Sequence, residues 1–201
     1  MRVIVIGGTG TIGSAVVKLL STRHEVVAVG HKRGAFHVDL ASPDSITSLF
    51  KAVGTCDAVV SAAGIAKFSS LDDLTYDDYL IGLKNKLMGQ ANLVRIGRPF
   101  VTNHGSFTLT SGVLSQNPIK GSASISMVNA GLEGFVRAAA IDMPRGIRVN
   151  VVSPPWVTET LLARGMDPSI GIPADRVAQA YLASVEGTMT GQTLDPGQIT
   201  A

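Results

Sequence analysis

Short apolar runs alternate along the chain with segments in which apolar residues recur every three or four positions. The apolar runs have strand length and lie at residues 3–6, 25–29, 36–40, 57–61, 106–110, 147–152 and 192–194. The helical spacing occurs at residues 14–22, 42–53, 71–97, 124–143 and 175–184. Such alternation predicts an α/β fold with a doubly wound, mostly parallel seven-stranded sheet and helices on both faces.

Composition and length narrow the class of protein further. The 201 residues contain no linker, repeat or low-complexity segment, so we expect a single domain over residues 1–201. With 45% hydrophobic and 16% charged residues, the chain is not of the disordered type. The formal net charge is only +2, so the chain lacks the excess of basic residues expected of a nucleic-acid binder. No apolar run is long enough to span a membrane. A lone cysteine, Cys56, excludes an intrachain disulfide and offers no metal-ligand spacing, so we expect no metal site. These negative observations together lead us to expect a cytoplasmic protein.

A glycine-rich turn follows the first predicted strand. Gly8, Gly10 and Gly13 fit the pattern G-x-G-x-x-G, and Gly7 precedes them directly. Glycines let a backbone approach a pyrophosphate, and the helix that begins there directs unpaired N–H groups at it. Alone, the pattern also fits a tight turn without a ligand, but between a strand and a helix it indicates a dinucleotide site. The candidate contacts in this turn are Gly7, Thr9, Gly10, Thr11, Ile12 and Gly13.

The end of the second predicted strand carries cations and no carboxylate. His31, Lys32 and Arg33 follow Gly30, where an acidic residue would favour NAD by binding the ribose 2′-hydroxyl. Two fixed positive charges suit a 2′-phosphate instead, so the sequence favours NADP(H) as the cofactor. A solvated basic loop is the simpler alternative.

Together these residues resemble the short-chain dehydrogenase/reductase family over essentially the full chain. The most specific match is Gly-Ile-Arg-Val-Asn-Val-Val-Ser-Pro at residues 146–154, and Thr-Gly-Gln at residues 190–192 resembles the family's last strand. Leu-Thr-Ser at residues 109–111 resembles the strand that carries the catalytic serine. The chain is shorter than most members, which implies a small substrate loop near residues 158–172. The resemblance implies further cofactor contacts at Asp39, Leu40, Ala62, Ala63, Gly64, Pro154 and Val157.

The chain departs from the family at its catalytic motif, Y-x-x-x-K. Ile125 stands at the tyrosine position and Asn129 at the lysine position, and neither has a group that titrates near neutral pH. Ser111 lies fourteen residues before Ile125, as the resemblance requires. The position of the family's relay asparagine falls on Asn85 or Lys86, and the spacing favours Lys86.

The candidate catalytic residues are therefore Ser111, Lys86 and Asn129. The alternatives are that Ser111 is a strand-end hydroxyl bonded to the backbone and that Lys86 is a solvated helix lysine. Trp156 either walls the pocket or packs as an ordinary core residue.

Two functions remain open at this point. The first is an NADP(H)-dependent oxidoreductase that acts on a small carbonyl or alcohol with a non-standard proton donor. The second is a weak or inactive NADP(H)-binding sensor or scaffold, which the loss of the tyrosine and lysine would explain. Many small residues in segments 84–97 and 124–143 favour close helix packing, and in the resembled family these helices pair, which implies a homodimer or homotetramer.

Overall fold

Seven parallel strands form the centre of the molecule. The computed structural model describes residues 1–199, and within them the sheet has the order β3-β2-β1-β4-β5-β6-β7. Every strand pairs in parallel with its neighbour, which confirms the predicted doubly wound sheet. The strands are β1 (Arg2–Ile6), β2 (Glu25–Gly30), β3 (Phe36–His37), β4 (Cys56–Ser61), β5 (Val101–Thr110), β6 (Arg148–Val152) and β7 (Thr193–Leu194).

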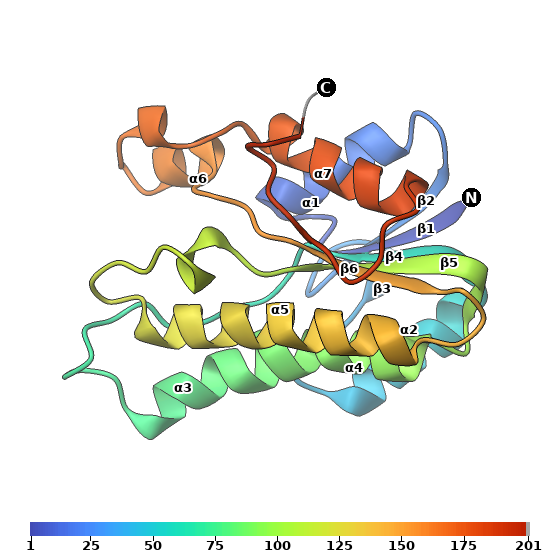
Figure 1. Cartoon of the computed structure of the whole chain (residues 1–201), viewed down its shortest axis with the longest axis horizontal. Coiled ribbons are helices and arrows are strands. Elements are labelled where there is room, and N and C mark those ends of the chain that lie inside the picture. The colour runs from blue at the N-terminus through green and yellow to red at the C-terminus, as the bar shows by residue number, and fades with distance from the viewer. Residues whose placement is uncertain (200–201) are drawn as a thin grey trace.

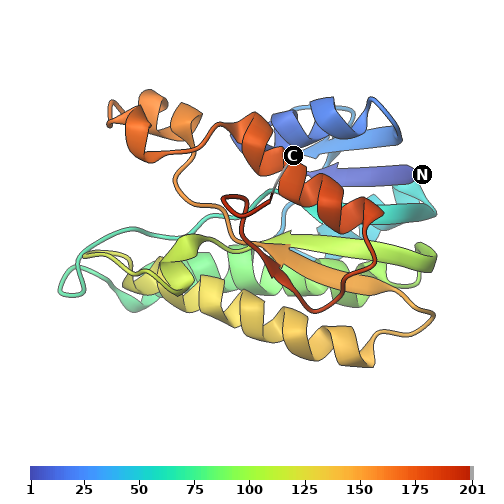
Figure 2. The same ribbon diagram turned by 45° about the horizontal axis from the view of Figure 1, so that its top comes forward.

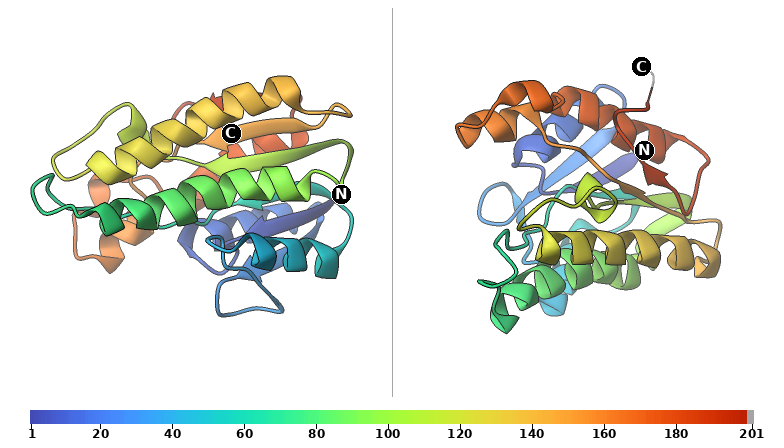
Figure 3. Two further views of the ribbon diagram at one scale, coloured as in Figure 1. Left: turned by 90° about the horizontal axis from the view of Figure 1, so that it is seen from below. Right: turned by 60° about the vertical axis from the view of Figure 1, so that its left-hand side comes forward.

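Helices cover both faces of the sheet. Figure 1 shows α1 (Thr11–Leu20) and α7 (Ala174–Glu186) on one face, with the short α6 (Thr158–Ala163) beyond them. The other face carries α2 (Pro43–Val53), α4 (Met88–Gly97) and α5 (Ala123–Asp142). Figure 2 shows the sheet obliquely, with its strands spread out between these layers, and the left view of Figure 3 shows α4 and α5 side by side. None of the helices in residues 1–199 is long and apolar enough to cross a membrane.

Alternation within the strands builds a core on each face. In β1, Ile4 and Ile6 belong to the cluster under α2, α4 and α5, whereas Val3 and Val5 belong to the cluster under α1 and α7. Successive side chains of a strand point to opposite faces, so a strand apolar at every position serves both clusters. This explains the unbroken Val/Ile run at the start of the chain.

Local sequence signals set the ends of the helices. Ser42 caps α2 by accepting a hydrogen bond from the Ser45 N–H, and Pro43 occupies the first turn. The next long helical stretch begins at Tyr76 rather than at residue 71, because Thr75 and Asp78 form a capping box there. β3 is shorter than the predicted strand 36–40, since the chain turns after His37 and residues 40–41 lie in a turn before α2.

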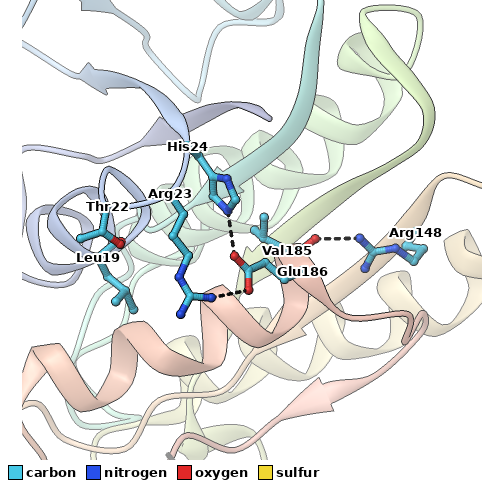
Figure 4. Close-up of polar contacts among 7 residues, drawn as sticks. All are labelled: Leu19, Thr22, Arg23, His24, Arg148, Val185 and Glu186. Atoms are coloured by element: carbon cyan, nitrogen blue, oxygen red, sulfur yellow. Dashed lines mark hydrogen bonds and ion pairs between the residues drawn. The ribbon is translucent and has the colours of Figure 1, made fainter.

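Polar contacts join α7 to the turn between α1 and β2, and to β6, at the edge of the sheet where the strands begin. Glu186, at the end of α7, accepts hydrogen bonds from Arg23 at 3.1 Å and His24 at 3.0 Å (Figure 4). Arg148, the first residue of β6, donates to the Val185 carbonyl at 2.9 Å. These contacts lie at the amino ends of the strands, opposite the glycine-rich turn, so they serve the packing of the helices.

Candidate active site

The first cavity lies at the carboxyl ends of β1, β2 and β4, where ligands bind in open parallel sheets. Its walls include part of the glycine-rich turn after β1, the start of the loop after β2 and the segment after β4. Many of the predicted cofactor contacts line it, namely Gly7, Thr9, Gly10, His31, Leu40, Ala62, Ala63 and Gly64. Asn85 completes the wall from the helical stretch before α4.

The glycines of the turn are required by its geometry. Gly7 has φ +79°, and a Cβ there would lie 2.7 Å from the Ala62 carbonyl oxygen. A Cβ at Gly13 would collide with the Gly7 carbonyl, so Gly13 permits α1 to begin directly against the turn. Gly10 differs, because it lines the cavity and a Cβ there would meet only the Gly7 oxygen, at 3.3 Å, within residues 1–199. The turn therefore leaves open space at Gly10, next to the amino end of α1. This arrangement fits a pyrophosphate, because the unpaired N–H groups of the helix end can bind its oxygens.

The other predicted cofactor contacts lie off this wall. Lys32 and Arg33 are exposed in the loop after β2, and the Asp39 carboxylate accepts a hydrogen bond from the Ala41 N–H at 2.9 Å. Asp39 therefore closes the turn into α2, while its neighbours Val38 and Leu40 line the cavity. The remaining predicted contacts lie elsewhere in the fold: Thr11, Ile12 and Gly13 in the first turn of α1, Pro154 in the second cavity, and Val157 at the start of α6.

A second cavity of about 220 Å³ brings the three candidate catalytic residues together. Ser111 reaches it from the end of β5, Lys86 from the stretch before α4, and Asn129 from α5. Ile125, at the tyrosine position, lines the same cavity. The indole of Trp156 also belongs to the wall, which agrees with the first of its two interpretations.

A π-helical turn positions Lys86. The stretch from α3 (Tyr76–Gly82) to α4 is interrupted by η1 (Leu83–Leu87), which has π-helical hydrogen bonding. Such turns insert one residue into a helix and are frequent at functional sites. Here Asn85 faces the first cavity and Lys86 the second. The two candidates for the relay position, of which the spacing favoured Lys86, thus line different cavities.

The Lys86 ammonium group is bound to the backbone at the end of β5. Its Nζ donates a hydrogen bond to the main-chain oxygen of Ser111 at 2.9 Å. Burial away from water lowers the pKa of Lys86 to about 8. No carboxylate within residues 1–199 forms an ion pair with it. At neutral pH the amino group is therefore mostly charged, and it loses its proton as the pH rises through about 8.

Asn129 has one satisfied and one free polar atom. Its Nδ2 donates to the Gly112 carbonyl at 3.2 Å, whereas its Oδ1 is buried without a partner within residues 1–199. A buried acceptor without a donor is costly unless a ligand supplies one. Asn129 can therefore accept a hydrogen bond from a bound hydroxyl or amide.

Glu133, which sequence patterns did not reveal, lies behind Ser111. The Ser111 hydroxyl donates to Glu133 Oε1 at 3.0 Å, and Ser115 Oγ donates to the same oxygen at 2.6 Å. Ser153 Oγ lies 3.5 Å from it. The available signal was spacing, since Ile125, Asn129 and Glu133 follow each other at four-residue intervals and so share one face of α5. A lone glutamate in a helix is usually solvated, and nothing nearby in the sequence marks this one as buried.

Comparison with known proteins places the chain in a family. A family model described as enoyl-(acyl carrier protein) reductase matches residues 12–193. The fold, the glycine-rich turn and this match agree: the chain belongs to the short-chain dehydrogenase/reductase family of oxidoreductases.

The similar proteins include solved structures and a protein named as a carbonyl reductase. The crystal structure of the protein lin1944 from Listeria innocua is 40% identical, with a TM-score of 0.93 over 97% of this chain and 98% of that one. Carbonyl reductase family member 4 of Danio rerio is 29% identical over 95% of this chain and 94% of its own length. A small-chain dehydrogenase in complex with NADPH shares the fold at 24% identity, with a TM-score of 0.85 over 97% of this chain and 95% of that one.

Proposed function

We propose that the protein is an NADP(H)-dependent oxidoreductase that interconverts a small carbonyl compound and its alcohol. The observation that carries the proposal is the convergence of Ser111, Lys86 and Asn129 on one cavity at the carboxyl ends of the strands. The likeness to carbonyl reductase family member 4 of Danio rerio supports the reaction class. The proton donor differs from that of the family, because Ile125 replaces its tyrosine.

The first cavity supports a dinucleotide as the cofactor. The open space at Gly10 and the amino end of α1 suit the pyrophosphate, and the apolar side chains of Val38 and Leu40 suit an adenine ring. His31 at the wall and the exposed Lys32 and Arg33 next to it suit a 2′-phosphate, which supports NADP(H) over NAD(H). When bound, NADPH supplies a hydride.

Each polar group of the second cavity has a distinct part in this proposal. Lys86 places a positive charge where negative charge develops on the carbonyl oxygen during reduction. Ser111 orients that oxygen through its hydroxyl group. Asn129 offers its free Oδ1 as an acceptor, which suits a ribose hydroxyl of the cofactor or a polar group of the substrate.

The walls of the second cavity limit the substrate. Most of its lining is apolar, with Phe68, Ile125 and Trp156 as the large side chains. The small volume and these walls favour a compact aldehyde, ketone or quinone with a single polar end. Arg164 at the same cavity adds a cation, so an acidic group on the substrate would find a partner there.

A second candidate function rests on the catalytic motif. Ile125 and Asn129 offer no titratable group, and losing a general acid typically removes a factor of about 10²–10⁴ from the rate. A protein with an intact dinucleotide cavity and a slow second cavity would act as an NADP(H) sensor or scaffold.

The test is NADPH oxidation by the purified protein with a panel of small aldehydes, ketones and quinones, beside NADPH binding measured by fluorescence. We expect turnover that is saturable in the carbonyl compound and lost in Ser111→Ala, with NADPH affinity unchanged in that variant. Tight NADPH binding without turnover across the panel favours the sensor. Failure to bind NADPH or NADH overturns both.

A further inference from the structure

Glu133 lies behind Ser111, outside the lining of the second cavity. The carboxylate projects from α5 and is 6% exposed. Its Oε1 accepts hydrogen bonds from hydroxyl groups of three separate segments. These belong to Ser111 after β5, Ser115 in the 3₁₀ turn Val113–Ser115, and Ser153 after β6. Burial of a carboxylate is costly without partners, and Glu133 has these hydroxyl groups but no ion pair within residues 1–199.

The contact with Ser111 links Glu133 to the cavity. A serine hydroxyl has one proton, and both acceptors that Ser111 Oγ reaches lie outside the cavity lining: Glu133 Oε1 at 3.0 Å and the Val152 carbonyl oxygen at 3.5 Å. Ser111 Oγ then presents only lone pairs to a ligand, which suits the hydroxyl group of an alcohol. If the carboxyl group instead carries a proton, it can donate to Ser111 Oγ, and the serine proton is free to turn toward a carbonyl oxygen.

We propose that Glu133 is the positioning residue for Ser111 and the store of the proton that the reduction consumes. The inference rests on the proposed function, because it supplies the proton donor that Ile125 cannot be. It also moves the site's acid–base group two turns along α5 from the family's tyrosine position, on the same helix face.

The proton transfer balances with the groups present. As the carbonyl carbon gains the hydride, its oxygen takes the Ser111 proton, and an O–H bond forms on the product alcohol. Ser111 Oγ takes the carboxyl proton of Glu133 at the same time, so serine ends neutral and Glu133 ends as a carboxylate. Solvent then restores the proton to Glu133, and alcohol oxidation follows the same path in reverse.

Lys86 contributes charge to this arrangement from the other side of Ser111. Its Nζ contacts the Ser111 carbonyl oxygen while Glu133 contacts the Ser111 hydroxyl. The cation therefore stabilises the developing oxyanion without having to lose its proton.

The test compares Glu133→Gln and Glu133→Ala with the wild type. Glu133→Gln keeps the shape and an acceptor oxygen but cannot pass a proton, so we expect kcat for carbonyl reduction to fall about 10²-fold. Its KM, its affinity for NADPH and its melting temperature should remain close to those of the wild type. Glu133→Ala leaves a space for a small acid, so added formate should restore its activity, but should not restore that of Glu133→Gln.

Glu186→Gln is the matched control, because it neutralises a partnered carboxylate at the opposite edge of the sheet. We expect its kcat to equal that of the wild type. A Glu133→Gln variant with wild-type kcat overturns the relay, and so does a Glu133→Ala variant that folds, binds NADPH and is not rescued by formate. A wild type without carbonyl reductase activity overturns the proposed function itself, so the two failures are distinguishable.

Discussion

The ammonium nitrogen of Lys86 lies 2.9 Å from the main-chain oxygen of Ser111, to which it donates a hydrogen bond. This contact joins the π-helical turn before α4 to the end of β5 and brings a cation to the second cavity. A hydrogen bond to a neutral carbonyl satisfies one N–H group but does not neutralise the charge, so burial still disfavours the ammonium form. The contact therefore combines a fixed position with a lowered pKa.

The first prediction concerns the pH dependence of carbonyl reduction. With a pKa of about 8, Lys86 is charged below that value and neutral above it. We expect kcat to be constant near neutrality and to fall as the pH rises through about 8, because the oxyanion loses its cation. The pH profile of NADPH oxidation checks this, and Lys86→Arg should remove the decline. A profile that stays flat to about pH 10, roughly two units above this pKa, would contradict a role for the Lys86 charge.

The same lowered pKa predicts a stability effect. Unfolded Lys86 has an ordinary pKa of 10.5, so between about 8 and 10.5 the unfolded chain binds more protons than the folded one. Stability therefore rises with pH across this window, and below it the buried cation costs up to about 3 kcal/mol. We expect Lys86→Met to raise the free energy of unfolding at pH 7 by about 1–3 kcal/mol in urea denaturation. Loss of stability in that variant would show that the hydrogen bond to Ser111 outweighs the burial cost.

The second prediction concerns cofactor choice. Lys32 and Arg33 are exposed next to His31, so replacing them does not disturb the core. We expect the wild type to bind NADPH at least about tenfold more tightly than NADH, since a charge-assisted hydrogen bond to a phosphate contributes about 1.5–3 kcal/mol. Lys32→Asp with Arg33→Ala should erase or invert the preference in a fluorescence titration. Lys51→Asp, at an exposed position on α2, repeats the charge reversal of Lys32→Asp away from the cofactor cavity and so controls for it. Equal affinities in the wild type would mean that the basic loop is only solvated.

The third prediction concerns assembly. An apolar groove of about 460 Å³ runs between α4 and α5, lined by Met88, Val94, Phe135 and Ala138 among others. The small residues of these helices permit close approach of a second copy, so we expect a homodimer or homotetramer with isologous contacts. Ala138→Arg should shift the mass from light scattering at micromolar concentration to that of a monomer. Ser48→Arg on α2 should leave the assembly intact, and a monomeric wild type would count against the prediction.

The sequence predicted the sheet because the apolar runs of its central strands are buried on both faces, as the residues of β1 show. The cavity residues were harder. Spacing favoured Lys86 over Asn85 at the relay position, but it did not show the π-helical turn that brings these two residues to different cavities. Glu133 was missed because its partners, Ser115 and Ser153, are distant in sequence and meet only in the folded chain.

The last prediction restores the family's motif. Ile125 lines the second cavity and is half-buried, so a tyrosine there would extend into existing space, at an overpacking cost of about 1–3 kcal/mol. Ile125→Tyr with Asn129→Lys should raise carbonyl reduction with NADPH, and the gain should not exceed the general-acid factor of about 10²–10⁴. The single variant Ile125→Tyr should gain less, because no lysine at position 129 lowers the phenol's pKa.

The same variants separate the two proton donors. Adding Glu133→Gln to the restored double variant should leave its rate nearly unchanged, because the new phenol donates the proton directly. If Glu133→Gln is as damaging there as in the wild type, the carboxylate supports the shape of the site, and the proton comes from another group.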